Sequence, residues 1–339
     1  MNKLIIALCI AILVVGAASC KKNPVEPEEE EENLTPGRRD YTWVADTIKN
    51  PFLHLYHIWG NSLTNLWTSS TMYSASLFKY DGTKWVLDDR TYLPTPAALW
   101  GYEDKLWIGN GNGCIWQFTG SSYQEQLKYH KLGDNFTDFL NMVGSSDKEI
   151  YVSGSYRIDK LNYSVLMKYD GNVWKVDKKF DYPFTVLQIC YSLRNDRYYI
   201  TSTNNNGPET VYEYDRTNFK EIFKYHTSNP GPTLAVIDKY AHIVIEDKVY
   251  RYRNDKMELI TGINDAKFGG IVWGRGRNDI FIRMIDGLAH YNGSDVKYQF
   301  KVPESYRMNA NMAIFEKDVF ISAMDLNSGY NIIYHGKLN

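Results

Sequence analysis

Residues 77–85 read Leu-Phe-Lys-Tyr-Asp-Gly-Thr-Lys-Trp, and this pattern recurs along the chain with its spacing held fixed. An apolar run ends in an aromatic residue, here Tyr80. A polar Asp-Gly turn follows, and a second large residue, here Trp85, comes five positions after the first. Asp-Gly between two apolar runs is a strong signal for a β-hairpin. The stretch therefore predicts the third and fourth strands of a small antiparallel sheet.

Five more pairs of large residues share this offset of five. Counted from Tyr80, their first members follow one another at intervals of 38, 51, 45, 38 and 39 residues. Repeats of this length are typical of four-stranded propeller blades and not of helical solenoids. The pairs are Phe118/Tyr123, Tyr169/Trp174, Tyr214/Phe219, Tyr252/Met257 and Tyr291/Val296.

Two further apolar runs precede each hairpin, and a seventh pair of runs follows the last hairpin. β-Branched and aromatic residues dominate these runs, which predicts the two inner strands of each blade. The sequence therefore predicts an all-β fold, a seven-bladed β-propeller of four-stranded blades over residues 41–339. The first runs are 58–60, 99–101, 142–144, 189–191, 234–237, 272–274 and 312–315, and the second are 66–67, 106–109, 150–152, 198–200, 243–245, 280–282 and 319–321.

The seventh set has a third strand, residues 332–334, but no fourth strand after it. Residues 43–46 (Trp-Val-Ala-Asp) match the fourth strand at 85–88 (Trp-Val-Leu-Asp) in type and order, and they precede the first blade without a hairpin of their own. An open sheet edge invites aggregation. We therefore expect the ring to be closed by an N-terminal strand that completes the last blade.

The segment before the propeller divides into two parts. Lys3 and the apolar run 4–15 indicate a signal peptide over residues 1–19, because a membrane span needs roughly 20 apolar residues. The small residues before Cys20 resemble a bacterial lipoprotein processing site, at which Cys20 would be lipidated. An ordinary signal peptide with a coincidental Cys20 is the alternative. Residues 20–40 are acidic and polar, which predicts a flexible tether.

Charge and cysteine content restrict the partners and the cross-links. The net charge of −2 leaves no basic stripe to neutralise phosphates, so we expect no nucleic acid partner. Cys114 and Cys190 fall two blades apart in the predicted ring. A disulfide needs Cα atoms within about 7 Å, so both cysteines are expected to be free and buried.

No residue pattern indicates a metal site, a cofactor or a catalytic residue. His54 and His57 are three apart, which places them on opposite faces of a strand, and no second cluster of ligands accompanies them. The glycine-rich stretch 109–113 precedes a strand, whereas a phosphate loop opens a helix, so a tight turn is expected. A carboxylate pair for glycoside hydrolysis stays open, because its separation is a three-dimensional quantity.

Ligand contacts are expected where the repeat is broken, in the unequal loops between second and third strands. The inner-strand Trp residues recur at equivalent positions and are expected to be scaffold. The long loops at 69–74, 155–163, 203–209 and 325–330 carry aromatic, amide and charged residues, which can stack on and hydrogen-bond to a carbohydrate or peptide. Tolerated insertions without a ligand are the alternative. The candidate binding residues are Tyr73, Tyr156, Arg157, Asn204, Asn205 and Asp325.

Once aligned, the repeat of Trp-Gly, then Leu-Trp-Ile, then Lys-Tyr-Asp-Gly-x-x-Trp resembles the propeller repeats of secreted, mostly uncharacterised Bacteroidetes-like lipoproteins. It is also similar to the sensor propellers of periplasmic two-component regulators. It lacks the Gly-His and Trp-Asp pairs of WD40 repeats and the Ser-x-Asp-x-Gly-x-Thr-Trp turn of sialidases. The acidic run after Cys20 resembles surface-export signals of Bacteroidetes lipoproteins.

The resemblance implies a lipid-anchored protein of the outer membrane, facing the cell surface or the periplasm. We expect a monomeric binding protein, not an enzyme, that presents its loops to a glycan or an envelope protein, uses no cofactor and touches the membrane only through Cys20. Two alternatives stay open. One is a propeller glycosidase or polysaccharide lyase, and the other is a structural subunit of an outer-membrane assembly.

Overall fold

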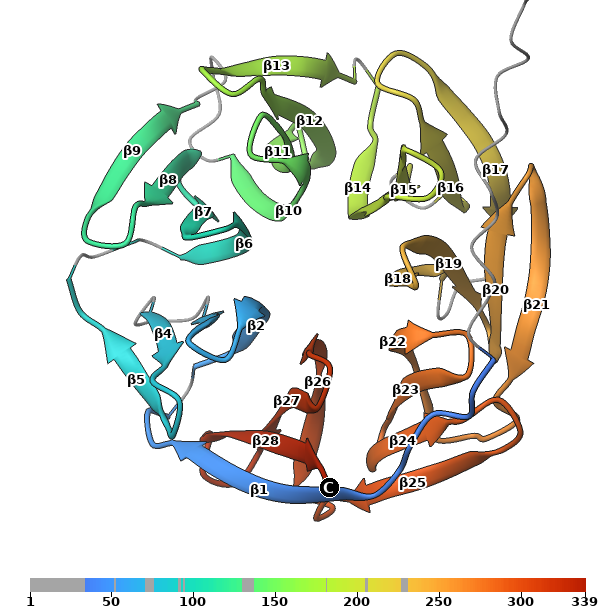
Figure 1. Cartoon of the computed structure of the whole chain (residues 1–339). Helices are drawn as coiled ribbons and strands as arrows, with labels where there is room; N and C mark the ends of the chain where they lie inside the picture. Colours follow the sequence, from blue (N-terminus) through green and yellow to red (C-terminus); the bar gives the residue numbers. More distant parts are fainter. Residues whose placement is uncertain are drawn as a thin grey trace, which may run out of the picture. The chain divides into compact units, whose positions relative to one another are not determined.

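A computed structural model describes residues 34–339 except 52, 71–75, 91–92, 94, 130–136, 181, 205–206 and 227–230. Within these described residues there are 28 β-strands and no helix. The strands form seven antiparallel sheets of four, arranged as the blades of a ring (Figure 1). The predicted all-β, seven-bladed propeller of four-stranded blades is confirmed.

Six blades are built from consecutive strands, and the seventh takes its outer strand from the beginning of the described chain. Blades one to three are β2 (Leu55–Ser62), β3 (Asn65–Ser70), β4 (Ser76–Tyr80), β5 (Trp85–Asp88); β6 (Pro96–Tyr102), β7 (Lys105–Asn110), β8 (Cys114–Phe118), β9 (Tyr123–Lys128); and β10 (Asp138–Ser146), β11 (Glu149–Ile158), β12 (Leu161–Tyr169), β13 (Trp174–Lys179). Blades four and five are β14 (Thr185–Ser192), β15 (Arg197–Thr203), β16 (Glu209–Tyr214), β17 (Phe219–Tyr225); and β18 (Thr233–Ile237), β19 (Tyr240–Ile245), β20 (Lys248–Arg253), β21 (Lys256–Gly262). Blades six and seven are β22 (Phe268–Gly276), β23 (Asp279–Met284), β24 (Gly287–Tyr291), β25 (Val296–Lys301); and β26 (Tyr306–Ile314), β27 (Asp318–Asp325), β28 (Asn331–Leu338), β1 (Tyr41–Ile48).

The residue pairs that define the repeat are cross-strand partners. Tyr80 lies opposite Trp85, and the five other pairs lie opposite one another in the same way. In the turn of blade one, the Asp81 carboxylate accepts hydrogen bonds of 2.8 Å from the backbone N–H groups of Thr83 and Lys84. Gly82 has a φ of 100°, which glycine adopts without strain. The fixed offset of five residues thus reflects one repeated hairpin turn in five of the six hairpins, whereas the hairpin of blade five turns at Asn254 and Asp255, both with positive φ.

The repeated Trp-Gly pairs join neighbouring blades. The Trp59 ring of blade one lies against Gly101 of blade two, and the Trp100 ring of blade two lies against Gly144 of blade three. A Cβ atom on Gly144 would be 2.5 Å from a ring carbon of Trp100, closer than atoms can approach. The large ring and the missing side chain are therefore complementary, and these Trp residues are scaffold, as the sequence predicts.

Acidic residues on three outer strands also connect their blades to the following blade. In each case the acid comes three residues after the outer-strand Trp, and the donor belongs to the aromatic hairpin pair of the following blade. The outer-strand sequence Trp-x-x-Asp therefore encodes a contact between blades as well as a strand. The bonds run to Asp46 from the Trp85 N–H (2.9 Å), to Asp88 from the Tyr123 hydroxyl (2.7 Å) and to Asp177 from the Tyr214 hydroxyl.

The hydrophobic core is divided among the interfaces between blades. One cluster combines Trp67 and Leu77 of blade one with Leu99 and Leu106 of blade two, all of them buried. The innermost strand of every blade contacts the innermost strands of both neighbours, from β2 through β6, β10, β14, β18, β22 and β26 back to β2. A ring of small cores therefore replaces the single core of an ordinary domain.

Strand β1 closes the ring. All eight of its residues pair with β28, from Tyr41 opposite Leu338 to Ile48 opposite Asn331. The Trp43 ring covers Gly336, and Ile48 is buried in the core between blades seven and one. Figure 1 shows β1 as the outermost strand beside β28. The predicted completion of the last blade by residues 43–46 is confirmed.

The two cysteines of the described chain lie two blades apart and are both free, as predicted. Cys114 is on β8 in blade two and Cys190 is on β14 in blade four. Cys114 is buried, but Cys190 is only partly buried because it lies on an innermost strand. Burial of the Cys190 thiol nevertheless raises its pKa to about 12, so it stays protonated at neutral pH.

Candidate functional site

The meander topology of a blade defines two faces of the ring. Successive strands are antiparallel, so the start of the first strand, the turn between the second and third strands and the connection to the next blade all lie on the same face. We call this face the loop face. The sequence places its candidate ligand residues there.

The structure corrects the predicted loop at 155–163. Tyr156 belongs to β11 and pairs with Tyr163 of β12, and only Asp159 and Lys160 form the turn. Both turn residues have positive φ, 47° and 68°, as two-residue hairpin turns require. Tyr156 is 3% exposed and stacks on Tyr163 with ring centroids 5.6 Å apart. The stacked pair extends the hairpin, so Tyr156 is a core residue of blade three.

The other predicted binding residues are dispersed over several blades. Arg157 is exposed on β11, and Asn204 is exposed after β15 in the neighbouring blade four. Asp325 ends β27 in blade seven, where its carboxylate accepts hydrogen bonds from the Asn327 N–H (3.0 Å) and the Ser328 hydroxyl (2.6 Å) and so holds the turn. These hydrogen bonds lower the pKa of Asp325. Tyr73, Asn205 and Cys20 lie outside the described residues.

The described ranges contain neither a metal-binding cluster nor a membrane-spanning helix. There, no three His, Cys, Asp or Glu side chains come together in a way that could hold a metal ion. In the same ranges, no helix is long and apolar enough to cross a membrane. The stretch 109–113 forms the predicted tight turn between β7 and β8.

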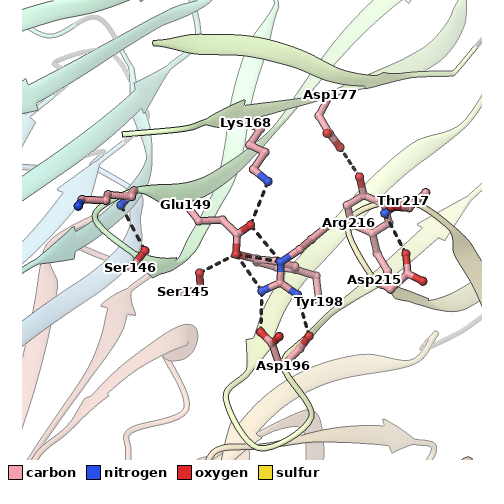
Figure 2. Close-up of polar contacts among 12 residues, drawn as sticks. Ser145, Ser146, Glu149, Lys168, Asp177, Asp196, Tyr198, Asp215, Arg216 and Thr217 are labelled. Atoms are coloured by element: carbon pink, nitrogen blue, oxygen red, sulfur yellow. Dashed lines mark hydrogen bonds and ion pairs between the residues drawn. The ribbon is translucent and has the colours of Figure 1, made fainter. Parts of the chain in front are cut away.

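The most extensive polar cluster lies between blades three and four. Figure 2 shows Glu149 of β11 between Lys168 of β12 and Arg216, which follows β16. The Glu149 carboxylate accepts hydrogen bonds from Arg216 (2.8–3.0 Å), Lys168 (2.9 Å) and Ser145 (2.7 Å). Burial alone would raise the Glu149 pKa, but these donors outweigh it and lower the pKa to about 2.

Arg216 takes a backbone conformation that favours glycine. Its φ is 78°, and it follows Asp215 at the position where Gly82 and Gly171 stand in the turns of blades one and three. Such strain persists only where the surroundings compensate it. Here the side chain turns back to Glu149 and also donates to Asp196. The cluster is closed on itself and fastens two blades together.

A second polar region lies at the loop face, along the first residues of the innermost strands. Six of these strands carry a β-bulge near their first residues, in β2, β6, β10, β14, β22 and β26. A bulge removes backbone groups from the strand ladder. The freed carbonyl groups then need other donors.

Side chains from other blades supply several of these donors. The His57 side chain extends from blade one across blade two to blade three. The equivalent residue of blade two is Ala98, whose small side chain leaves room for the histidine ring. Burial lowers the pKa of His57 to about 4, so the ring is neutral. This histidine is structural, as the sequence predicts. The contacts are Asn141 Nδ2 to Leu187 O (3.1 Å), Thr233 Oγ1 to Gly270 O (2.5 Å) and His57 Nε2 to Leu140 O (3.0 Å).

Arg283 of β23 lies beside the bulge of β22, and only backbone carbonyls hold its guanidinium. Nε donates to Met308 O at 3.1 Å, and Nη1 donates to Gly269 O at 2.9 Å. No carboxylate of the described residues pairs with it. Burial and, after it, the charge of Arg307 lower the pKa of Arg283. A half-buried guanidinium without a counter-ion is unfavourable in free energy.

Arg307, the second residue of β26, adds a second unpaired charge at the same place. It is exposed, and its side chain has no hydrogen bond or ion pair within the described part of the chain. Burial and the charge of Arg307 lower the pKa of His54, which precedes β2. The Tyr56 ring lies 6.2 Å from the His54 ring. We call His54, Tyr56, Arg283 and Arg307 the cationic rim, which spans blades six, seven and one.

A signal in the sequence could have identified Arg283. The residue beside the bulge on the second strand is small in five other blades, and arginine replaces it only in blade six. This break in the repeat is visible once the second strands are aligned on their apolar runs, because Arg283 follows residues 280–282 as Gly109 follows residues 106–108. The equivalent residues are Ser69, Gly109, Ser153, Thr201 and Ser322.

Comparisons with known proteins support the fold. No protein-family model and no curated protein matches the chain. A solved structure described as YCF48 bound to D1 peptide matches with a TM-score of 0.60 and 14% identity, over 88% of this chain and 99% of that chain. The Neurospora crassa Pan2 WD40 domain matches with a TM-score of 0.63 and 12% identity, over 90% and 98%. The Myceliophteria thermophila Cps50 (Swd1) β-propeller domain matches with 0.59 and 11%, over 87% and 99%. At these identities the similarity shows the fold alone.

Proposed function

We propose that this protein is a binding protein that holds a peptide or protein partner against the cationic rim on its loop face. The observation that carries the proposal is the unpaired charge of Arg283 and Arg307 among the described residues. Among the described residues, four other shielded arginines pair with carboxylates, whereas the half-buried Arg197 donates only to a backbone carbonyl. Those ion pairs are Arg39–Asp295, Arg216–Glu149, Arg251–Glu258 and Arg275–Asp279.

The position of the rim suits a macromolecular partner. Its side chains come from three consecutive blades, so a ligand that touches all of them bridges blades six, seven and one. The neighbouring turn of blade seven presents Leu326, whose side chain is 57% exposed. The similarity to a propeller described as bound to a peptide supports a peptide partner in preference to a glycan.

Membrane attachment belongs to the same proposal. Lipidation of Cys20 would hold the propeller at the outer membrane. The sequence predicts a flexible tether over residues 20–40, but the last part of this segment is bound to blade six, where the Gly37 N–H donates to Asn278 O (2.8 Å) and Arg39 pairs with Asp295, so the proposed tether is the part before residue 34. Both lie largely outside the described residues, and what supports the proposal is the sequence pattern before and after Cys20.

A binding screen on the full chain tests the rim directly. The protein, Arg307→Glu and Lys317→Glu are each applied to peptide and glycan arrays, with the supernatants assayed for hydrolysis products. Lys317 is exposed between β26 and β27, on the opposite face of the same blade, so the two variants change the net charge equally. We expect Arg307→Glu to lose the bound peptides and Lys317→Glu to keep them. Equal binding by both variants, or product formation, would contradict the proposal.

A further inference from the structure

We infer that the cationic rim binds the carboxylate groups of an acidic peptide segment. This inference rests on the proposed function and names the chemistry of its ligand. Its basis is the set of hydrogen-bond donors that Arg283 and Arg307 leave open, together with the backbone acceptors around them.

The open donors match carboxylates in geometry. Arg283 uses Nε and Nη1 for backbone carbonyls, so its Nη2 donors carry no hydrogen bond within the described residues. Arg307 offers its whole guanidinium. A planar guanidinium takes a carboxylate through two parallel N–H bonds. The two groups belong to β23 and β26, in different blades, so they suit two carboxylates along one chain.

The surrounding backbone favours a peptide over a phosphate. Bulges free carbonyl oxygens from the strand ladder at the rim. Of the two that hold Arg283, Met308 O belongs to a buried residue, whereas Gly269 is only half-buried and its carbonyl oxygen can accept a second hydrogen bond. A phosphate offers mainly acceptor oxygens, which such carbonyls repel. A peptide offers both carboxylates for the guanidinium groups and backbone N–H groups for the carbonyls.

The Tyr56 side chain of the rim and the net charge of the protein also bear on an acidic peptide ligand. Tyr56 is half-buried, and its hydroxyl has no hydrogen-bond partner among the described residues, so it is available to a bound chain. The net charge of the protein is −2, so an acidic peptide gains no general attraction. Binding of such a peptide would therefore show contacts at the rim and not an attraction to the overall charge of the protein.

The test is a titration of the full chain with hexaglutamate that carries an amidated C-terminus and a fluorescein label, followed by fluorescence anisotropy. Hexaglutamine is the neutral control peptide. We expect saturable binding of hexaglutamate only, weakened about tenfold or more in Arg307→Gln and less in Arg307→Lys, which keeps the charge but not the planar fork. Lys317→Gln is the matched variant and should bind within about twofold of the unchanged protein.

The outcomes separate this inference from the proposed function. Absence of hexaglutamate binding, or equal binding by Arg307→Gln and the unchanged protein, would overturn the acidic-peptide inference. The Arg307→Glu variant can still lose binding to glycans or to array peptides without acidic residues. In that case the rim is a binding surface for a ligand of another kind. A second variant, Arg283→Gln, checked for an unchanged melting temperature, should weaken hexaglutamate in the same way.

Discussion

Deletion of residues 41–48 from the full chain is expected to lower its Tm by about 8 °C, because about 5 kcal/mol of stabilisation is lost. The deletion removes an eight-residue strand that pairs with β28 along its whole length. It also uncovers Gly336 and the core residue Ile333, and it leaves β28 as an open edge. The measurement is a thermal melt followed by circular dichroism, with light scattering to detect aggregation.

A matched variant and a complementation experiment make the result specific. Val44 is 59% exposed on β1, so Val44→Thr should melt within about 1 °C of the unchanged protein. A synthetic peptide of residues 41–48 should restore part of the lost Tm by adding back the strand. A cooperative melt of the deletion variant at an unchanged temperature would show that the ring is not held closed by β1.

Replacement of Glu149 by glutamine is expected to lower the free energy of unfolding by about 3 kcal/mol at neutral pH. Lys168 then loses its carboxylate partner, and Arg216 keeps only Asp196. The Glu149 pKa is lowered from its ordinary value of 4.5 to about 2, so its stabilising effect is fully present above about pH 4.5 and disappears as the pH falls towards 2. The difference between the two proteins in urea denaturation should shrink over the same interval.

A second substitution tests why Arg216 tolerates its backbone conformation. With Glu149 replaced, the turn still requires a positive φ at Arg216, and of the two ion pairs of Arg216 only the exposed one with Asp196 remains. Arg216→Gly should therefore stabilise the Glu149→Gln variant, although it destabilises the unchanged protein. Destabilisation by Arg216→Gly in both backgrounds would show that the ion pair does not offset backbone strain.

The fold could be predicted from the sequence because each blade repeats the same local signals. The hairpin pair at offset five recurs as direct cross-strand partners, as Tyr80 and Trp85 show. Trp59 and Gly101 recur as a ring and the space that it fills in the next blade. Signals that repeat can be checked against one another, so a single ambiguous strand does not alter the architecture.

The details of blade three could not be predicted, because a loop and an extended hairpin share their composition there. The segment around Tyr156 is polar and aromatic, which suggested a ligand loop. The turn residues Asp159 and Lys160 adopt positive φ without a glycine to mark them. The strands therefore continue further than the other blades suggest, and Tyr156 is buried against Tyr163.

The cationic rim could not be predicted from the sequence for a different reason. His54, Arg283 and Arg307 come from widely separated repeats and form no motif. Closure of the ring places blade one beside blade seven, so residues near both ends of the propeller approach one another. The bulges that free the carbonyl groups from the strand ladder are visible only in the register of the strands.

The most direct measurement of the central claim is photo-crosslinking from the rim. A benzoylphenylalanine is placed at Ala310, an exposed residue in the bulge of β26 close to Arg307, or at Lys317 on the opposite face of the same blade. Each full-chain variant is irradiated with the envelope proteins of the cell, and the crosslinked peptides are identified by mass spectrometry. We expect crosslinks to one acidic segment from position 310 and none to it from position 317. The same crosslinks from both positions, or crosslinks from position 317 alone, would contradict it.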